Sequence, residues 1–237
     1  MIFKRLLNLI FPEGYSCINC GIEIFDQSKG FCENCLKSLT YINGKVCYHC
    51  GDPLVSDGDY CKRCKGKKFI VDRAIAPFTY KGIIKNLIFK LKYQGAKYLA
   101  KPLSNFMIEK FNTINLTYDY IIPIPLCSKR FKQRGYNQSL LLAQNIDKQK
   151  IMDNNLIRIK ETQEQASLTA ISRKKNMIGA FKLKDKKLVK DKIILLIDDV
   201  YTTGATTDEC AKILKQANAK AVYVLTLAHT ILSKKNN

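Results

Sequence analysis

The 237-residue sequence lacks any apolar run close to the roughly 18 residues that a membrane-spanning helix needs. It also lacks a recognisable signal peptide, because Asn8 interrupts the short apolar part of residues 1–11 and no small-residue cleavage site follows. We therefore expect a cytoplasmic protein in which residues 1–11 form a core or interface helix, with docking on a membrane surface as the alternative. A hydrophobic content of 46% at this length excludes a wholly disordered chain.

Acidic side chains are scarce. Asp and Glu number 20 against 40 Lys and Arg, which gives a formal net charge of +20. Residues 1–71 carry +3 of this charge and residues 72–237 carry +17. Such an excess indicates a phosphate-bearing partner such as nucleic acid, although a solvated lysine-rich surface has the same composition. Any electrostatic surface for nucleic acid should therefore lie in residues 72–237.

Cysteine, in contrast, is abundant and regularly spaced. Eight of the ten cysteines form four C-x-x-C pairs, which are Cys17/Cys20, Cys32/Cys35, Cys47/Cys50 and Cys61/Cys64. Two such pairs supply the four thiolates of a closed tetrahedral Zn²⁺ site, and two sites of this kind are structural rather than catalytic. Disulfides would need an oxidising compartment, for which no export signal is visible. The pattern therefore predicts two structural zinc ions, with iron as the alternative metal.

The pairs repeat in a way that indicates a tandem duplication. The motif Cys17-x-x-Cys20-Gly21 recurs 30 residues later, and the gaps between the pairs within the two units are 11 and 10 residues. This favours sequential sites in which each unit binds its own ion, while an interleaved arrangement stays open. We interpret His49, which lies inside a C-x-x-C turn, as a surface residue, and we expect no role for His229.

Residues 72–237 alternate apolar strands with helices. We expect strands at 73–80, 120–124, 156–159, 192–197 and 221–228, and helices at 83–111, 139–147 and 207–218, the first of them broken near Gly95 and Pro102. A basic loop is expected near 128–134 and a mobile loop at 161–179. This alternation predicts an α/β domain with a mainly parallel sheet. Residues 65–71 are a plausible linker, so we expect two domains, 1–70 and 71–237.

The most informative segment is IILLIDDVYTTGATTDEC, residues 193–210. A buried strand ends in Asp198 and Asp199, and a threonine-rich loop then enters a helix, where Thr206 and Glu209 match a capping box. Open α/β sheets bind ligands at the carboxyl ends of their strands, and a helix N-terminus favours phosphate. Two adjacent carboxylates can accept hydrogen bonds from the neighbouring hydroxyls of a ribose. The segment therefore predicts a phosphosugar site.

This segment resembles the ribose-phosphate loop of type I phosphoribosyltransferases. The resemblance implies that Asp198 and Asp199 bind the ribose hydroxyls of phosphoribosyl pyrophosphate (PRPP). It implies that Lys129 and Arg130 bind the pyrophosphate together with Mg²⁺, and that Arg173 lies on a flexible loop over the site. It further implies that the loop binds the 5′-phosphate, through residues Tyr201, Thr202, Thr203, Gly204, Ala205 and Thr206.

The whole chain resembles the ComF family more closely still. The motifs that carry this resemblance are the four C-x-x-C pairs, Pro123-Ile-Pro125-Leu126, Arg134-Gly-Tyr-Asn-Gln138, Gln165-x-x-Leu168, Arg173-x-x-Asn176, Phe181 and the segment 198–206. The resemblance implies an α/β, type I phosphoribosyltransferase-like domain, with a mainly parallel sheet and helices on both faces, behind a small double zinc ribbon. It also implies a competence factor that binds PRPP or a related phosphosugar. Such a factor handles single-stranded DNA during natural transformation, together with other DNA-uptake proteins.

Two alternatives to this function stay open. The first is a metabolic phosphoribosyltransferase that transfers ribose 5-phosphate to a small acceptor, in which Asp198, Asp199, Lys129, Arg130 and Arg173 would be catalytic. Purine-salvage members commonly carry an Asp where this chain has Thr202, which cannot act as a base near neutral pH, and this weakens a purine-salvage function. The second alternative is a zinc scaffold with a relict sugar site.

Overall fold

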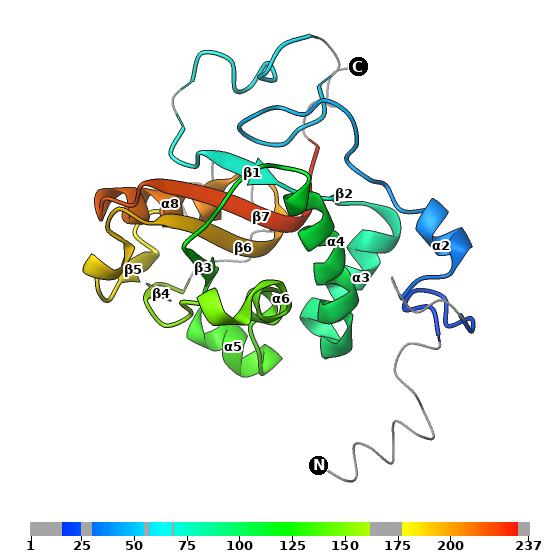
Figure 1. Cartoon of the computed structure of the whole chain (residues 1–237). Helices are drawn as coiled ribbons and strands as arrows, with labels where there is room; N and C mark the ends of the chain where they lie inside the picture. The colour runs from blue at the N-terminus through cyan, green and yellow to red at the C-terminus, as the bar shows by residue number, and fades with distance from the viewer. Residues whose placement is uncertain (1–15, 25–29, 55–56, 68, 162–176, 232–237) are drawn as a thin grey trace.

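The computed structural model describes residues 16–24, 30–54, 57–67, 69–161 and 177–231 (Figure 1). A parallel five-stranded sheet forms the centre, with β1 (Arg73–Ile75), β7 (Ala221–His229), β6 (Ile193–Tyr201) and β3 (Tyr120–Pro123) in that order, and β2 (Phe78–Thr79) beside β7. β1 and β2 pair with successive parts of β7, since Ala74 is opposite Val224 and Phe78 is opposite Ala228. The expected strand at 73–80 is therefore present as two short pieces along one edge of the sheet.

The central strand β6 shows why this sheet needs helices on both faces. Its residues Ile194, Leu195, Leu196 and Ile197 are all completely buried. Successive side chains of a strand point to opposite faces, so a run of buried residues means that both faces are covered. Leu195 and Ile197 belong to one hydrophobic core, and Ile194 and Leu196 belong to the other.

Within the described residues, helices α3 (Gly82–Tyr93), α4 (Ala100–Asn112) and α6 (Gln138–Ile146) cover the first face of the sheet and α8 (Ala205–Gln216) covers the second (Figure 1). On the second face, α8 lies next to an antiparallel pair made of β4 (Leu156–Arg158) and β5 (Phe181–Leu183). The short elements are α2 (Glu33–Lys37), α5 (Ser128–Arg134), η1 (Lys97–Leu99), η2 (Lys148–Lys150) and η4 (Lys187–Val189). The predicted fold class is confirmed.

Three local expectations are wrong. Residues 128–134 form helix α5 instead of a loop, and Gly135 ends this helix in the left-handed conformation with a φ of 76°. The strand β6 does not end at the two acids but continues through them to Tyr201. Pro102 lies in the first turn of α4, where its missing N–H needs no partner, so the break between α3 and α4 lies near Gly95 alone.

The cysteine-rich segment follows the outer edge of the sheet. Tyr41 forms an antiparallel bridge with Phe78, and the Ile42 N–H donates to the carbonyl of Pro77 at 2.7 Å. Cys17 lies in the core formed with α3 and α4, whereas Cys50 lies in the core formed with α8. The duplicated units therefore pack against opposite faces of the sheet, and the domain boundary at residues 70 and 71 stays a prediction. Among helices in the described ranges, none has the length and apolar character to cross a membrane.

Candidate functional site

A cavity of about 480 Å³ opens at the carboxyl ends of β3 and β6. Open parallel sheets bind ligands at this end of their strands. Most of the residues predicted to bind PRPP line the cavity, namely Asp198, Asp199, Tyr201, Thr202, Gly204, Ala205, Thr206 and Arg130. Thr203 and Lys129 are not among the lining residues, and Lys129 is exposed on α5. Arg173 lies outside the described residues.

The two acids make different contacts. An Oδ1 atom of Asp198 accepts hydrogen bonds from Ser139 Oγ at 3.0 Å and from the Asp199 backbone N–H at 2.9 Å. Asp199 is only 3% exposed, and its Oδ2 lies 2.5 Å from the Nζ atom of Lys92 on α3. The sequence analysis missed Ser139 and Lys92, because only the folded chain brings α3 and α6 to the end of β6.

Burial dominates the electrostatics of this group. Burial raises the pKa of the Asp198 carboxyl above its usual value, against the opposing charge of Lys92 and the hydrogen bond from Ser139. Burial also lowers the pKa of Lys92 to about 8, against the opposing charge of Asp198. Both shifts mean that the protein disfavours the charged forms at this place. Groups perturbed in this way are concentrated at functional sites.

The loop between β6 and α8 is built around Gly204. This residue has a left-handed φ of 80°, and a Cβ atom placed on it would lie 2.6 Å from the hydroxyl oxygen of Tyr201. Only glycine therefore fits here, and it directs the first backbone N–H groups of the 12-residue α8 to the cavity edge. The expected capping box is wrong, because helix α8 has Gly204 at its N-cap and Glu209 instead accepts from the Gly179 N–H at 2.8 Å.

The part of the cavity wall formed by α3, α5 and β4 is basic and aromatic. Burial lowers the pKa of Arg134 on α5, and the pKa of Arg158 on β4 is lowered for the same reason. Neither residue was predicted as a ligand, although Arg134 belongs to a motif that carried the family resemblance. Further lining residues of this wall are Lys85, Lys92, Tyr80, Phe89 and Tyr93.

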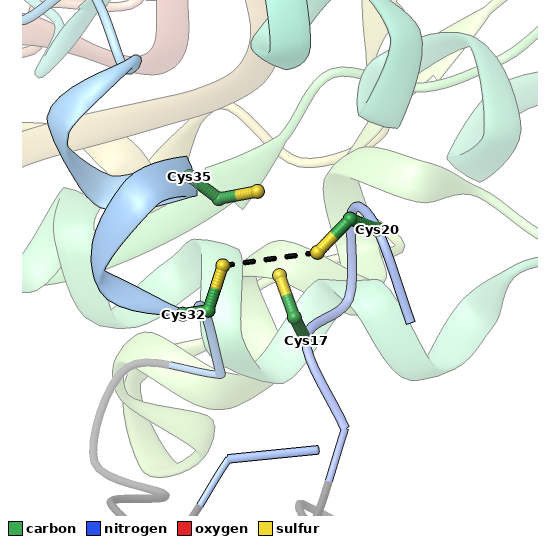
Figure 2. A group of neighbouring side chains, drawn as sticks. All are labelled: Cys17, Cys20, Cys32 and Cys35. Carbon is green, nitrogen blue, oxygen red and sulfur yellow. Dashed lines mark hydrogen bonds between the residues drawn. The ribbon is translucent and has the colours of Figure 1, made fainter. Parts of the chain in front are cut away.

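The eight paired cysteines form two clusters in the sequential arrangement. Cys17, Cys20, Cys32 and Cys35 converge in one cluster, shown in Figure 2, and Cys47, Cys50, Cys61 and Cys64 converge in the other, all sulfurs of a cluster lying within 4.8 Å of one another. The Sγ atoms of Cys20 and Cys32 are 3.7 Å apart, as are those of Cys50 and Cys61. A tetrahedral Zn²⁺ with Zn–S bonds of about 2.3 Å requires sulfurs about 3.8 Å apart. Both clusters therefore fit zinc.

Both histidines are buried, which contradicts the interpretation of His49. His49 is 5% exposed and stacks on Phe69 with ring centroids 3.4 Å apart, so its interpretation as a surface residue is wrong. His229 is 1% exposed, and its Nδ1 lies 3.2 Å from a carboxylate oxygen of Asp52. His229 also stacks on Tyr201 at 5.1 Å and thereby connects the second ribbon with the ligand loop.

Known proteins resemble this chain both in the cysteine-rich segment and over nearly its whole length. Residues 6–65 match the family model of the double zinc ribbon domain. The DNA utilization protein YhgH of Escherichia coli K12 is 31% identical over 223 residues, which cover 91% of this chain and 97% of YhgH. The chain belongs to the ComF family. This ComF protein is also 29% identical to competence protein F of Haemophilus influenzae, over 90% of the chain and 96% of the relative. It is 28% identical to ComFC of Streptococcus pneumoniae over 96% and 93% of the two chains.

Solved phosphoribosyltransferases are more distant from this ComF protein. The hypoxanthine phosphoribosyltransferase of Staphylococcus aureus is 13% identical with a TM-score of 0.35, and the match covers 62% of this chain and 69% of the enzyme. An allosteric regulatory enzyme of purine biosynthesis is 12% identical with a TM-score of 0.38, over 58% and 29% of the two chains. At such low TM-scores these enzymes say nothing about the ligand of the cavity, so the ligand has to be inferred from the residues that line it.

Proposed function

We propose that this ComF protein binds PRPP or a related phosphosugar in the cavity at the end of β6, and that it handles single-stranded DNA during natural transformation. The observation that carries the first half is the meeting of two acids, a helix N-terminus and a basic wall in one cavity. The acids suit ribose hydroxyls, the N-terminus of α8 suits the 5′-phosphate, and the basic wall suits a pyrophosphate.

Each cationic residue has a proposed role. Arg130 binds the pyrophosphate, with Lys129 and Arg173 as further contributors from outside the described cavity wall. Mg²⁺ accompanies the ligand, because this ion prefers phosphate oxygens and one or two carboxylates, and among the described residues Asp198 and Asp199 supply the carboxylates of the cavity. The ion would neutralise part of the pyrophosphate charge. Transfer to a purine is not part of the proposal, because Thr202 offers no base.

The second half of the proposal rests on charge and on the family. The relatives are named for competence and for DNA utilization, and residues 72–237 carry a net charge of +17. A surface of this charge binds single-stranded DNA with an affinity that falls steeply as salt concentration rises. Other DNA-uptake proteins are proposed partners on the same family grounds.

Thermal unfolding in the presence of PRPP and Mg²⁺ tests the phosphosugar site. A ligand at about 100 times its dissociation constant should raise the melting temperature of a protein of this size by about 5–10 °C. Asp198→Asn/Asp199→Asn should remove this rise. Asp57→Asn/Asp59→Asn, which changes the charge equally on the exposed part of the second ribbon, should keep it. A wild-type protein without any rise would refute the site.

A further inference from the structure

Helix α3 presents a basic and aromatic ridge to solvent. Its inner face is fully buried, whereas Lys85, Phe89 and Tyr93 follow one another at four-residue spacing on the outer face and line the cavity. Phe89 is 51% exposed and Tyr93 is 60% exposed, with their ring centroids 5.1 Å apart. Single exposed aromatic residues are common, but an adjacent pair at the mouth of a ligand cavity marks a binding surface.

Helix α5 lies across from this ridge and supplies cations. The guanidinium of Arg134 lies 5.3 Å from the ring centroid of Tyr93, and the side chain of Arg134 also donates to Gln138, which holds it in place. Arg130 lines the cavity from the same helix. Cations from α5 and aromatic rings from α3 therefore line the same opening.

The opening continues beyond the phosphosugar cavity. A second cavity of about 330 Å³ shares Lys92, Tyr93, Arg130 and Arg134 with the first. It extends to Tyr136, whose ring has the ammonium of Lys97 4.8 Å above it. The described residues that line this second cavity include no carboxylate. We name the combined opening, from Phe89 past Tyr93 to Tyr136, the α3–α5 groove.

We propose that the α3–α5 groove binds single-stranded DNA, with bases stacked on Phe89 and Tyr93 and a backbone phosphate on Arg134, which lies beside Tyr93. The chemistry of the groove favours this occupant over others. Unpaired bases stack on exposed aromatic rings, whereas the bases of a duplex are already stacked on one another, and the cations require a polyanion. The inference rests on the proposed DNA-handling function and adds its location, which adjoins the phosphosugar cavity.

Fluorescence anisotropy with full-length, zinc-loaded protein tests the groove, using a labelled oligothymidine of about 12 nucleotides. Phe89→Leu/Tyr93→Leu keeps apolar bulk on α3 but removes both rings, and it should weaken binding about 5- to 100-fold. Phe89→Tyr/Tyr93→Phe keeps both rings and should bind like the wild type. The matched control is Tyr48→Leu/Tyr60→Leu. These two tyrosines are each 47% exposed and form a ring pair, and Arg73 lies over the ring of Tyr48.

The salt dependence of DNA affinity tests the arginine contact separately from the stacking. Arg134→Gln should reduce the slope of log affinity against log salt by about 0.7, which is the value for one phosphate contact on a single strand. A duplex of the same length should lose little affinity in Phe89→Leu/Tyr93→Leu, because its bases cannot reach the rings. An equal loss for duplex and single strand, or an equal loss in the Tyr48/Tyr60 control, would overturn the stacking role.

The outcomes also separate this inference from the function on which it rests. A wild-type protein that binds the oligonucleotide while Phe89→Leu/Tyr93→Leu binds it equally well overturns the groove and leaves the DNA function standing. A wild-type protein that binds no oligonucleotide even at low salt overturns both. Without ligand, the variant should unfold at the same temperature as the wild type, because both side chains are exposed and are replaced by apolar bulk, and this shows that the fold is intact. A loss of the heat stabilisation by PRPP and Mg²⁺ would show that the rings belong to the sugar site instead.

Discussion

Gly204→Ala tests the construction of the ligand loop directly. The new Cβ would lie 2.6 Å from the Tyr201 hydroxyl oxygen and 3.1 Å from the Tyr201 Cζ atom. Tyr201 cannot easily move away, because it is 6% exposed and stacks on His229. The substitution therefore destabilises the fold in two ways. It forces an alanine into the left-handed backbone conformation, and it creates an overpacked contact with Tyr201.

The structure separates these two costs. Gly135 has a φ of 76°, close to the 80° of Gly204, but a Cβ there would meet nothing within 4 Å. Gly135→Ala should therefore lower the free energy of unfolding by only the conformational cost, which is about 1 kcal/mol. Gly204→Ala adds overpacking of about 1–3 kcal/mol, for a total of about 2–4 kcal/mol. Tyr201→Phe removes the nearer of the two atoms, so Gly204→Ala/Tyr201→Phe should recover most of the added cost.

Urea unfolding in the presence of zinc measures the thermodynamic cycle of wild type, Gly204→Ala, Tyr201→Phe and their double variant, with Gly135→Ala measured beside it. The expected order of the free energies of unfolding is wild type, Gly135→Ala, the double variant and Gly204→Ala. If Gly204→Ala and Gly135→Ala agreed within about 0.5 kcal/mol, the contact with Tyr201 would carry no energy and the reasoning would fail. The same would follow if Tyr201→Phe added its own loss to that of Gly204→Ala without any recovery.

Two further predictions concern the lysine and the metals. Because burial lowers the pKa of Lys92 to about 8 from 10.5, the unfolded state binds more protons between these values, so this residue should make the fold more stable as pH rises through that window. The difference in pH dependence between wild type and Lys92→Met, measured by urea unfolding, checks the sign, and stability that falls across the window would contradict it. A chromogenic chelator should release zinc in two phases. The first ribbon, whose Cys20 is exposed, should lose its ion faster than the second, whose ligands are all buried. Cys20→Ser should affect the fast phase alone, and a single phase would count against the assignment.

The features that the sequence predicted well are those encoded locally. The C-x-x-C turns, the apolar strands and the acidic couplet each depend on residues close together in the chain, so spacing alone identifies them. The start of α8 was predicted less well. Thr206 and Glu209 match a capping box in the sequence, but in the structure Gly204 is the N-cap and the Glu209 side chain makes a tertiary contact. Glu209 accepts from Gly179 instead, and nothing near Glu209 in the sequence indicates that partner.

The features that the sequence did not predict depend on contacts between distant segments. Lys92 is one of several lysines on an amphipathic helix, and only its position 2.5 Å from Asp199 distinguishes it. Phe89 and Tyr93 are equally hard to recognise from the sequence, because an aromatic residue on a helix is usually part of a core. Exposure decides their interpretation, and exposure is a property of the folded chain.

The second zinc ribbon and the ligand loop are joined by one buried series of contacts. Asp52, which is completely buried, directly follows the second C-x-x-C-Gly turn, and its carboxylate lies 2.5 Å from Arg63 and 3.2 Å from His229. His229 stacks on Tyr201, which fixes the space that only glycine can fill at position 204. Through these contacts the second ribbon packs against the end of β7 and, by way of Tyr201, against the loop that follows β6. The ribbon and this edge of the cavity therefore share one set of buried contacts.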